Sequence, residues 1–187
     1  TVVLIAVLLF VVYRSVVTSA IPLLTVGLGL GVARGVVAFL GERDLIEVSI
    51  FSVSLLAAMV LGAATDYGIF LLGRYHEQRR AGVDHEQALV IANRSVAPVI
   101  AASGLIIAAA LSCLLFAQVG MLRSAGLPCA IGILTGMFAS LTLLPAFIGL
   151  AGRHGLAQPR RRAAAKVPGR SWRRVGTVVA RWPGPVL

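Results

Sequence analysis

Long apolar blocks constrain the fold of this chain more than any other feature of its sequence. They cover residues 1–13, 19–41, 48–73, 95–117 and 125–151. Apart from the first, each block reaches the roughly 20 residues that a helix needs to cross the hydrocarbon of a bilayer. Charged residues make up only 13% of the chain, against roughly 25% in a soluble domain. We therefore predict an all-α, polytopic transmembrane helix bundle over residues 1–152, with five spans.

The two ends of the sequence extend this bundle. The first block begins without Met and without a basic flank, so we interpret it as a truncated spanning helix rather than a signal peptide. Residues 153–181 are rich in Arg, Ala, Pro and Gly and are predicted to form a basic cytoplasmic linker. Residues 182–187 are predicted to begin a further span.

Basic residues alternate between the loops. The turn at Arg14, the loop 74–94 and the tail 153–181 together hold fourteen Lys and Arg residues, whereas the loops 42–47 and 118–124 hold two. Basic loops stay on the cytoplasmic side of a membrane. We therefore expect a multi-pass inner-membrane protein whose basic loops are cytoplasmic.

The net charge of +10 does not indicate a nucleic-acid partner. Nine of the seventeen Lys and Arg residues lie in 153–181, directly after an apolar block, where they hold a chain against the membrane surface. Membrane lipids are therefore the expected partners, and nucleic acid is not.

No metal site is predicted. His76-Glu77 and His85-Glu86 resemble the start of a zinc-protease HExxH motif, but the second His is missing in both cases. Cys113 and Cys129 lie inside apolar blocks and are interpreted as packing residues. The chain also has no glycine-rich phosphate loop. The sequence therefore predicts neither a bound cofactor nor an enzyme.

Local signals mark helix starts. Pro22 and Pro98 are placed near the starts of their helices, where a missing N–H is tolerated. Asp84, with Gln87 three residues later, resembles a capping box. It predicts a short cytoplasmic helix that leads into the span 95–117.

Small residues at helical spacing predict close helix packing. Gly27, Gly31 and Gly35 form a GxxxGxxxG series, and Gly62 opens a run of small residues beside Asp66. Such residues let helix backbones approach closely in lipid. Arg34 is interpreted as an anchor that reaches outward towards Glu42 or Asp44.

Asp66 is the one acidic residue placed inside the hydrocarbon. It precedes Arg74 by eight residues, or about 12 Å along a helix. A carboxylate at the centre of a lone helix costs about 2.5–3.5 kcal/mol on the lenient insertion scale. A structural hydrogen bond, a salt bridge or a titrating proton site would offset this cost. Intramembrane acids are functional sites by default.

The neighbours of Asp66 favour the proton site. Thr65 and Tyr67 carry hydroxyls that can bond a carboxyl group. Ser103 lies at nearly the same depth on the next span, so it is the best partner in this chain. Both proton relay and simple hydrogen bonding between helices fit this placement. Since Ser103 offers a single hydroxyl, we expect the Asp66–Tyr67 face to be open, with its true partners elsewhere.

Residues 62–71 and 74–77 resemble the signature of the MmpL (mycobacterial membrane protein large) family, within the resistance-nodulation-division transporters. Trp172 and the residues that lead to Trp182 resemble that family's approach to its seventh helix. The resemblance implies that the chain covers the second to sixth helices. It implies that the porter domains and the whole second half of the transporter lie outside this sequence.

The resemblance implies export of lipids, glycolipids, siderophores or other hydrophobic molecules, driven by the proton gradient. Asp66 and Tyr67 match the family's Asp-Tyr pair, which interlocks with an equivalent pair in the missing half, and Ser103 matches a serine of the same relay. Two alternatives resemble this family in part: the first shares its helix arrangement, and the second shares a proton-driven motor that uses an Asp in the same helix. They are a sterol-sensing-domain-like module that binds lipids and a protein-export accessory subunit.

Overall fold

Four long helices and one short 3-10 helix make up the part of the chain described by a computed structural model, residue 7 and residues 16–153. They are α2 (Val16–Glu42), α3 (Ile50–Arg80), α4 (His85–Ser112), η1 (Cys113–Phe116) and α5 (Gly120–Arg153). Each long helix is long and apolar enough to cross a membrane. The predicted all-α, polytopic class is confirmed. Apart from residue 7, the predicted span at 1–13 lies outside the described residues, as do the linker beyond residue 153 and the segment 182–187.

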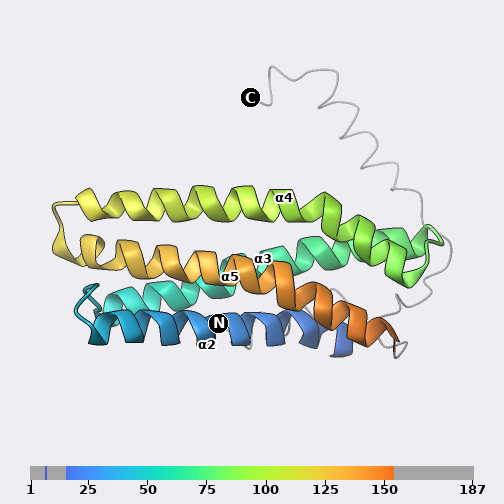
Figure 1. Ribbon diagram of the computed structural model, residues 1–187, viewed down its shortest axis with the longest axis horizontal. Helices are drawn as coiled ribbons and strands as arrows, with labels where there is room; N and C mark the ends of the chain where they lie inside the picture. Colours follow the sequence, from blue (N-terminus) through green and yellow to red (C-terminus); the bar gives the residue numbers. More distant parts are fainter. Residues whose placement is uncertain (1–6, 8–15, 154–187) are drawn as a thin grey trace, which may run out of the picture.

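Helix α5 lies at the centre of the bundle and packs against α2, α3 and α4. Helices α2 and α4 flank it on opposite sides, and α3 lies behind it (Figure 1). Successive helices run in opposite directions, so α3 and α5 point the same way. The α2–α3 loop and the α4–α5 turn therefore share one end of the bundle, and the α3–α4 turn lies at the other (Figure 1).

The α3–α4 turn is built by two local motifs. Gly82 has a φ of 87°, and the N–H of Val83 donates to the carbonyl of Gln78 at 3.2 Å. This is a Schellman ending, in which glycine takes the left-handed conformation. Asp84 then caps α4, because its carboxylate accepts from the N–H of Glu86 at 3.3 Å. Backbone hydrogen bonds from His85 and Glu86 lower the pKa of Asp84 below its usual value.

The N-cap predicted at Asp84 is confirmed, but the helix it starts is not a separate one. Helix α4 runs without a break from His85 to Ser112. Pro98 therefore lies in the interior of α4, and Pro22 lies in the interior of α2, so their predicted positions near helix starts are wrong. Pro128 and Pro145 also lie inside α5. Interior prolines remove a backbone hydrogen bond and bend helices, and both α4 and α5 bend along their lengths (Figure 1).

A reciprocal capping box begins α3. The N–H of Ser52 donates to the Ser49 hydroxyl oxygen at 3.1 Å, and the N–H of Ser49 donates to the Ser52 hydroxyl oxygen at 2.9 Å. Two orphan N–H groups of the helix start are thereby satisfied.

Small residues let α5 approach its neighbours. A Cβ on Gly132 would lie 2.9 Å from Cγ of Leu56, and one on Gly29 would lie 3.1 Å from Cβ of Ala139. The first pair brings α5 against α3, and the second brings α2 against α5. In lipid there is no hydrophobic driving force between helices, so such close packing supplies much of their attraction.

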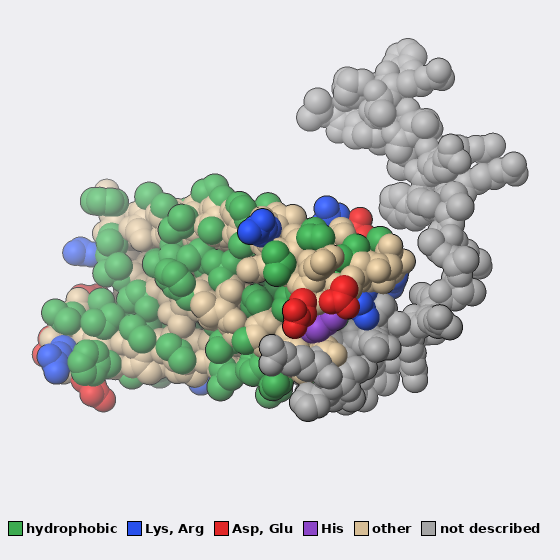
Figure 2. Space-filling view, turned by 45° about the vertical axis from the view of Figure 1, so that its right-hand side comes forward, with side chains coloured by type: hydrophobic (Ala, Val, Ile, Leu, Met, Phe, Trp, Pro, Cys, Tyr) green, Lys and Arg blue, Asp and Glu red, His purple; other side chains and the backbone are tan. Residues whose placement is uncertain are grey.

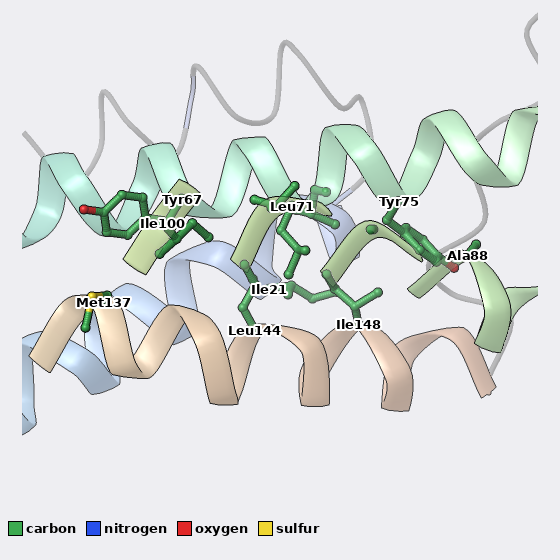
Figure 3. Packing of buried hydrophobic residues seen from close by; sticks show 12 residues of the cluster. Ile21, Tyr67, Leu71, Tyr75, Ala88, Ile100, Met137, Leu144 and Ile148 are labelled. Carbon is green, nitrogen blue, oxygen red and sulfur yellow. The ribbon is translucent and has the colours of Figure 1, made fainter. Parts of the chain in front are cut away.

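The largest buried cluster fills the space between all four helices. It includes Tyr67 and Leu71 of α3, Ile100 of α4, Leu144 of α5 and Ile21 of α2, as Figure 3 shows. The outer surface is apolar as well, and charged side chains gather mainly towards the two ends of the bundle (Figure 2). This distribution fits a protein whose middle faces lipid or other apolar helices.

Candidate functional site

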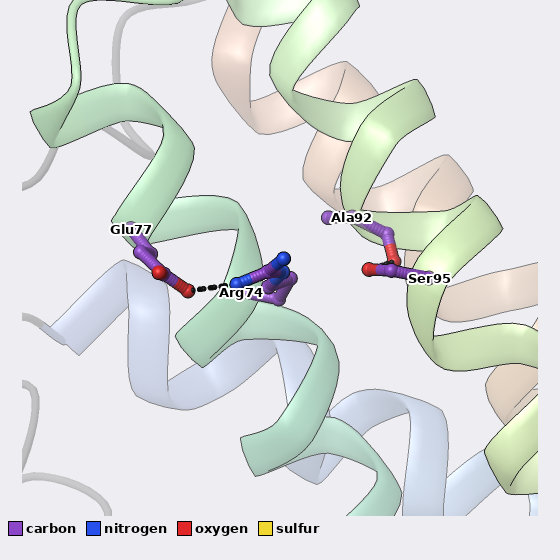
Figure 4. Close-up of polar contacts among 4 residues, drawn as sticks. All are labelled: Arg74, Glu77, Ala92 and Ser95. Carbon is purple, nitrogen blue, oxygen red and sulfur yellow. Dashed lines mark hydrogen bonds and ion pairs between the residues drawn. The ribbon is translucent and has the colours of Figure 1, made fainter.

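Asp66 lies in the interior of α3 and its side chain is exposed. Within residues 16–153 its carboxylate makes no hydrogen bond and no ion pair. The nearest basic residue along α3, Arg74, instead pairs with Glu77 at 2.6 Å between Nη1 and Oε2. Figure 4 shows this pair beside Ser95 of α4. The Asp66 carboxylate is therefore free to receive a proton or a partner from outside the described helices.

Tyr67, next to Asp66 in α3, is buried. It is only 6% exposed, packs in the central cluster, and its hydroxyl oxygen has no hydrogen-bond partner among the described residues. Consecutive residues lie about 100° apart around a helix axis, so Asp66 and Tyr67 leave α3 in different directions although both border one groove. The expectation of an open face is met for Asp66 and is wrong for Tyr67. The buried hydroxyl is the second unsatisfied polar group of this site.

Thr65 does not bond Asp66. Its hydroxyl donates to the carbonyl of Leu61 at 2.5 Å, the usual local bond of a threonine inside a helix. The predicted hydrogen bond from the Thr65 hydroxyl to the Asp66 carboxyl group is therefore absent in this conformation.

Ser103 and Asp66 line the same groove between α3 and α4. The groove has a volume of about 400 Å³, and Ile133 of α5 lines it as well. Tyr67 lies along the same groove. Its lining is otherwise mainly apolar: Met59, Gly62, Ala63, Phe70, Val96, Val99, Ile100 and Ile107. The structure thus brings together the three residues predicted for a proton relay, Asp66, Tyr67 and Ser103, but no hydrogen bond joins them.

Phe70 is a lining residue that the sequence analysis missed. It follows Asp66 by four residues, a spacing that places both on one helix face, and it is 64% exposed. This four-residue spacing from Asp66 is the feature of the sequence that could have identified Phe70 as part of the site. Together with Val99 it makes the surroundings of the carboxylate apolar.

The glycines predicted for helix packing lie on open surfaces. Around Gly27, Gly31, Gly35 and Gly62 a Cβ would meet nothing within 4 Å. The described helices do not pack on these positions, so the packing role stays a prediction for helices beyond them. Arg34 is also exposed on α2, and no ion pair joins it to Glu42 or Asp44 among the described residues.

Comparison with known proteins identifies the family. The MMPL family profile matches residues 1–186. The chain belongs to the MMPL family. This confirms the resemblance of the Asp66-Tyr67 region, and the membership covers nearly all of the chain.

Several MMPL relatives carry names that state a function. The probable transport protein MmpL9 of Mycobacterium tuberculosis is 48% identical over 183 residues, which are 98% of this chain and 19% of the relative. The siderophore exporter MmpL5 of the same species is 46% identical over 184 residues, 98% of this chain and 19% of the relative. The sulfolipid-1 exporter MmpL8 is 36% identical over 181 residues, 97% of this chain and 16% of the relative. The chain thus spans less than a fifth of the length of these MMPL relatives.

Proposed function

We propose that this chain is the membrane part of one half of an inner-membrane exporter driven by the proton-motive force. Asp66 would take up and release one proton in each transport step. The observation that carries the proposal is the unpaired Asp66 carboxylate on a spanning helix, facing an apolar groove that Tyr67 and Ser103 also line.

A site that empties and refills is the simplest way to couple a proton gradient to movement. One charge that crosses the membrane gains about 2.3 kcal/mol per 100 mV. The neutral, protonated carboxyl suits the apolar lining, whereas the carboxylate demands a partner. The protonated and deprotonated states of Asp66 therefore favour different arrangements of the helices that form the groove.

The partner of the carboxylate is proposed to come from the rest of the transporter. The groove is open in this half, and the Tyr67 hydroxyl also lacks a partner among the described residues. Many transporters place the coupling site between two repeats. A helix of the second half that supplied polar groups to this groove would satisfy both Asp66 and Tyr67.

The cargo is proposed to be a lipid, a glycolipid, a siderophore or another hydrophobic molecule. MMPL relatives are named as a siderophore exporter and a sulfolipid-1 exporter. These names favour a transporter over a sterol-sensing-like regulatory module, a protein-export accessory subunit or an enzyme. No cofactor besides the proton gradient is proposed.

Replacement of Asp66 tests the proposal in the full-length transporter. Asp66→Asn keeps the size and polarity of the side chain but cannot titrate, so export should be lost at normal protein abundance. Asp66→Glu can titrate and should retain part of the export. Asp44→Asn, in the exposed α2–α3 loop, is the matched control and should export normally. Normal export by the Asp66→Asn variant would show that Asp66 is structural.

A further inference from the structure

His85 joins three helices at the end of the bundle where α3 gives way to α4. It is the first residue of α4. Its Nδ1 lies 2.8 Å from the hydroxyl oxygen of Tyr75 in α3. Its Nε2 lies 3.3 Å from the carbonyl oxygen of Gly149 in α5. The Tyr75 and His85 rings also meet edge to face, with centroids 5.7 Å apart.

The two partners define the tautomer of a neutral His85 ring. The Gly149 carbonyl can only accept, so Nε2 must carry the hydrogen and donate to it. Nδ1 then has a lone pair and accepts from the Tyr75 hydroxyl. Each ring nitrogen is thus assigned to a different helix, and each bond has the correct donor and acceptor.

The space around the ring is shaped for it. Tyr75 is 1% exposed, so its hydroxyl depends on the bonds it makes within the bundle, to His85 and to Arg79 of its own helix. A Cβ on Gly152 of α5 would overlap the His85 ring. A side chain at position 152 would therefore push the ring out of place.

Several other polar side chains at this corner bond within α3 or around the α3–α4 turn. Arg79 donates from Nη1 to the carbonyl of Val83 at 2.9 Å, and Asp84 caps α4. Arg74 bonds Glu77 within α3. His85, by contrast, connects α3 to α5 across this corner through its two hydrogen bonds.

We propose that His85 is a positioning residue that holds the ends of α3 and α5 together, so that the two helices move as one unit. Helix α3 carries Asp66, and α5 ends at Arg153, where the basic segment begins. A shift of α3 that follows a change of charge at Asp66 would therefore be passed to the end of α5. The clamp itself stands on the contacts above, whereas its effect on transport rests on the proposed function.

Three substitutions of similar size separate the two bonds. His85→Gln places an amide near the Nε2 position and can keep the bond to Gly149. His85→Asn places an oxygen near the Nδ1 position and can keep the bond to Tyr75. His85→Leu keeps neither. Tyr75→Phe removes the hydroxyl, and Gly152→Ala displaces the ring without changing either bonding partner.

The first readout is a distance. Spin labels at Arg80 and Leu150, both exposed, measure the separation of the ends of α3 and α5 in the full-length protein. The clamp predicts a narrow distribution in the parent protein and a broad one in the His85→Leu and Gly152→Ala variants. Distributions as narrow as that of the parent in both variants would overturn the proposal.

The second readout is a double-mutant cycle on thermal stability. Tyr75→Phe should have a larger effect in the His85→Asn background than in the His85→Leu or His85→Gln background, because there the bond between Tyr75 and residue 85 is already lost. Equal effects of Tyr75→Phe in all backgrounds would show that the two residues act independently, and would contradict the clamp.

The third readout is export. His85→Leu should lower the rate by roughly threefold to tenfold, the change that corresponds to the loss of about one hydrogen bond, at an unchanged half-saturating substrate concentration. His85→Gln should restore part of the rate. If distances broaden but export is unchanged, the positioning role in transport is wrong. Failure of the proposed function would be seen separately, as normal export by the Asp66→Asn variant.

Discussion

The Cβ of Pro22 in α2 lies 2.8 Å from the position that a Cβ on Gly68 of α3 would occupy. The two helices therefore touch with no room for a side chain on Gly68. The proline ring is rigid, so it cannot turn aside as a long side chain would. This contact lies two residues along α3 from Asp66, and it brings α2 close to the helix that carries the carboxylate.

Gly68→Ala is therefore expected to destabilise the bundle. Overpacking costs about 1–3 kcal/mol, and the better helix propensity of alanine recovers up to about 1 kcal/mol. With the full recovery, the net loss should be at most about 2 kcal/mol, seen as a lower thermal midpoint in detergent. Gly73→Ala on the same helix is the control, because nothing lies within 4 Å of its added Cβ. Equal midpoints for the two variants would contradict the close contact.

The glycine series of α2 gives a second prediction. Gly31 is exposed and open, whereas Gly29 faces Ala139. If helices outside the described residues pack on the open face, Gly31→Leu should impair export by the full-length protein, and Gly31→Ala should be tolerated. A Gly31→Leu variant as stable and active as the parent would show that this face meets only lipid.

These two glycines also show what sequence spacing can predict. The GxxxGxxxG pattern identifies one face of α2, but the described bundle packs the other face, through Gly29. The spacing shows that one helix face carries only small residues. It does not show which neighbouring helix packs against that face. The same limit applies to Asp66 and Ser103. Their similar depth in the membrane follows from their positions in the sequence, but the groove that they share depends on how α3 and α4 pack.

Tyr67 gives a prediction that separates stability from transport. Its buried hydroxyl has no partner among the described residues, so Tyr67→Phe removes no bond within the described helices. The thermal midpoint of the full-length protein should fall little, since one hydrogen bond to the other half is worth only about 1 kcal/mol. Export should fall strongly if the hydroxyl serves the proton site. A variant that loses stability but exports normally would contradict this role.

The alternation of basic residues predicts the orientation of the loops. In a variant without Cys113 and Cys129, a cysteine at Asp44 should react with an impermeant reagent added outside. A cysteine at Ala81, at the opposite end of the bundle (Figure 1), should react only after the inner face is exposed. If the cysteine at position 81 reacted from outside and the cysteine at position 44 did not, the proposed orientation would be wrong.

The contacts of His85 show where the sequence analysis had no signal. In the sequence, His85-Glu86 matches only the start of a metal motif and its neighbour Asp84 matches a helix cap, because both patterns are local. The bonds to Tyr75 and Gly149 join residues that are 10 and 64 positions away from it. Only the packing of three helices brings them together. The cap at Asp84 and the long apolar helices could be predicted because each depends only on residues that are close together in the sequence.

Proton flux in liposomes tests the central claim most directly. The full-length transporter, reconstituted with an imposed pH gradient and its lipid cargo, should carry protons at a rate that depends on the cargo. The Asp66→Asn variant, inserted at the same density and with the same thermal midpoint, should carry none above empty liposomes. The Asp44→Asn variant should match the parent. Cargo-dependent proton flux through the Asp66→Asn variant at the parent rate would contradict the assignment of Asp66 as the proton carrier.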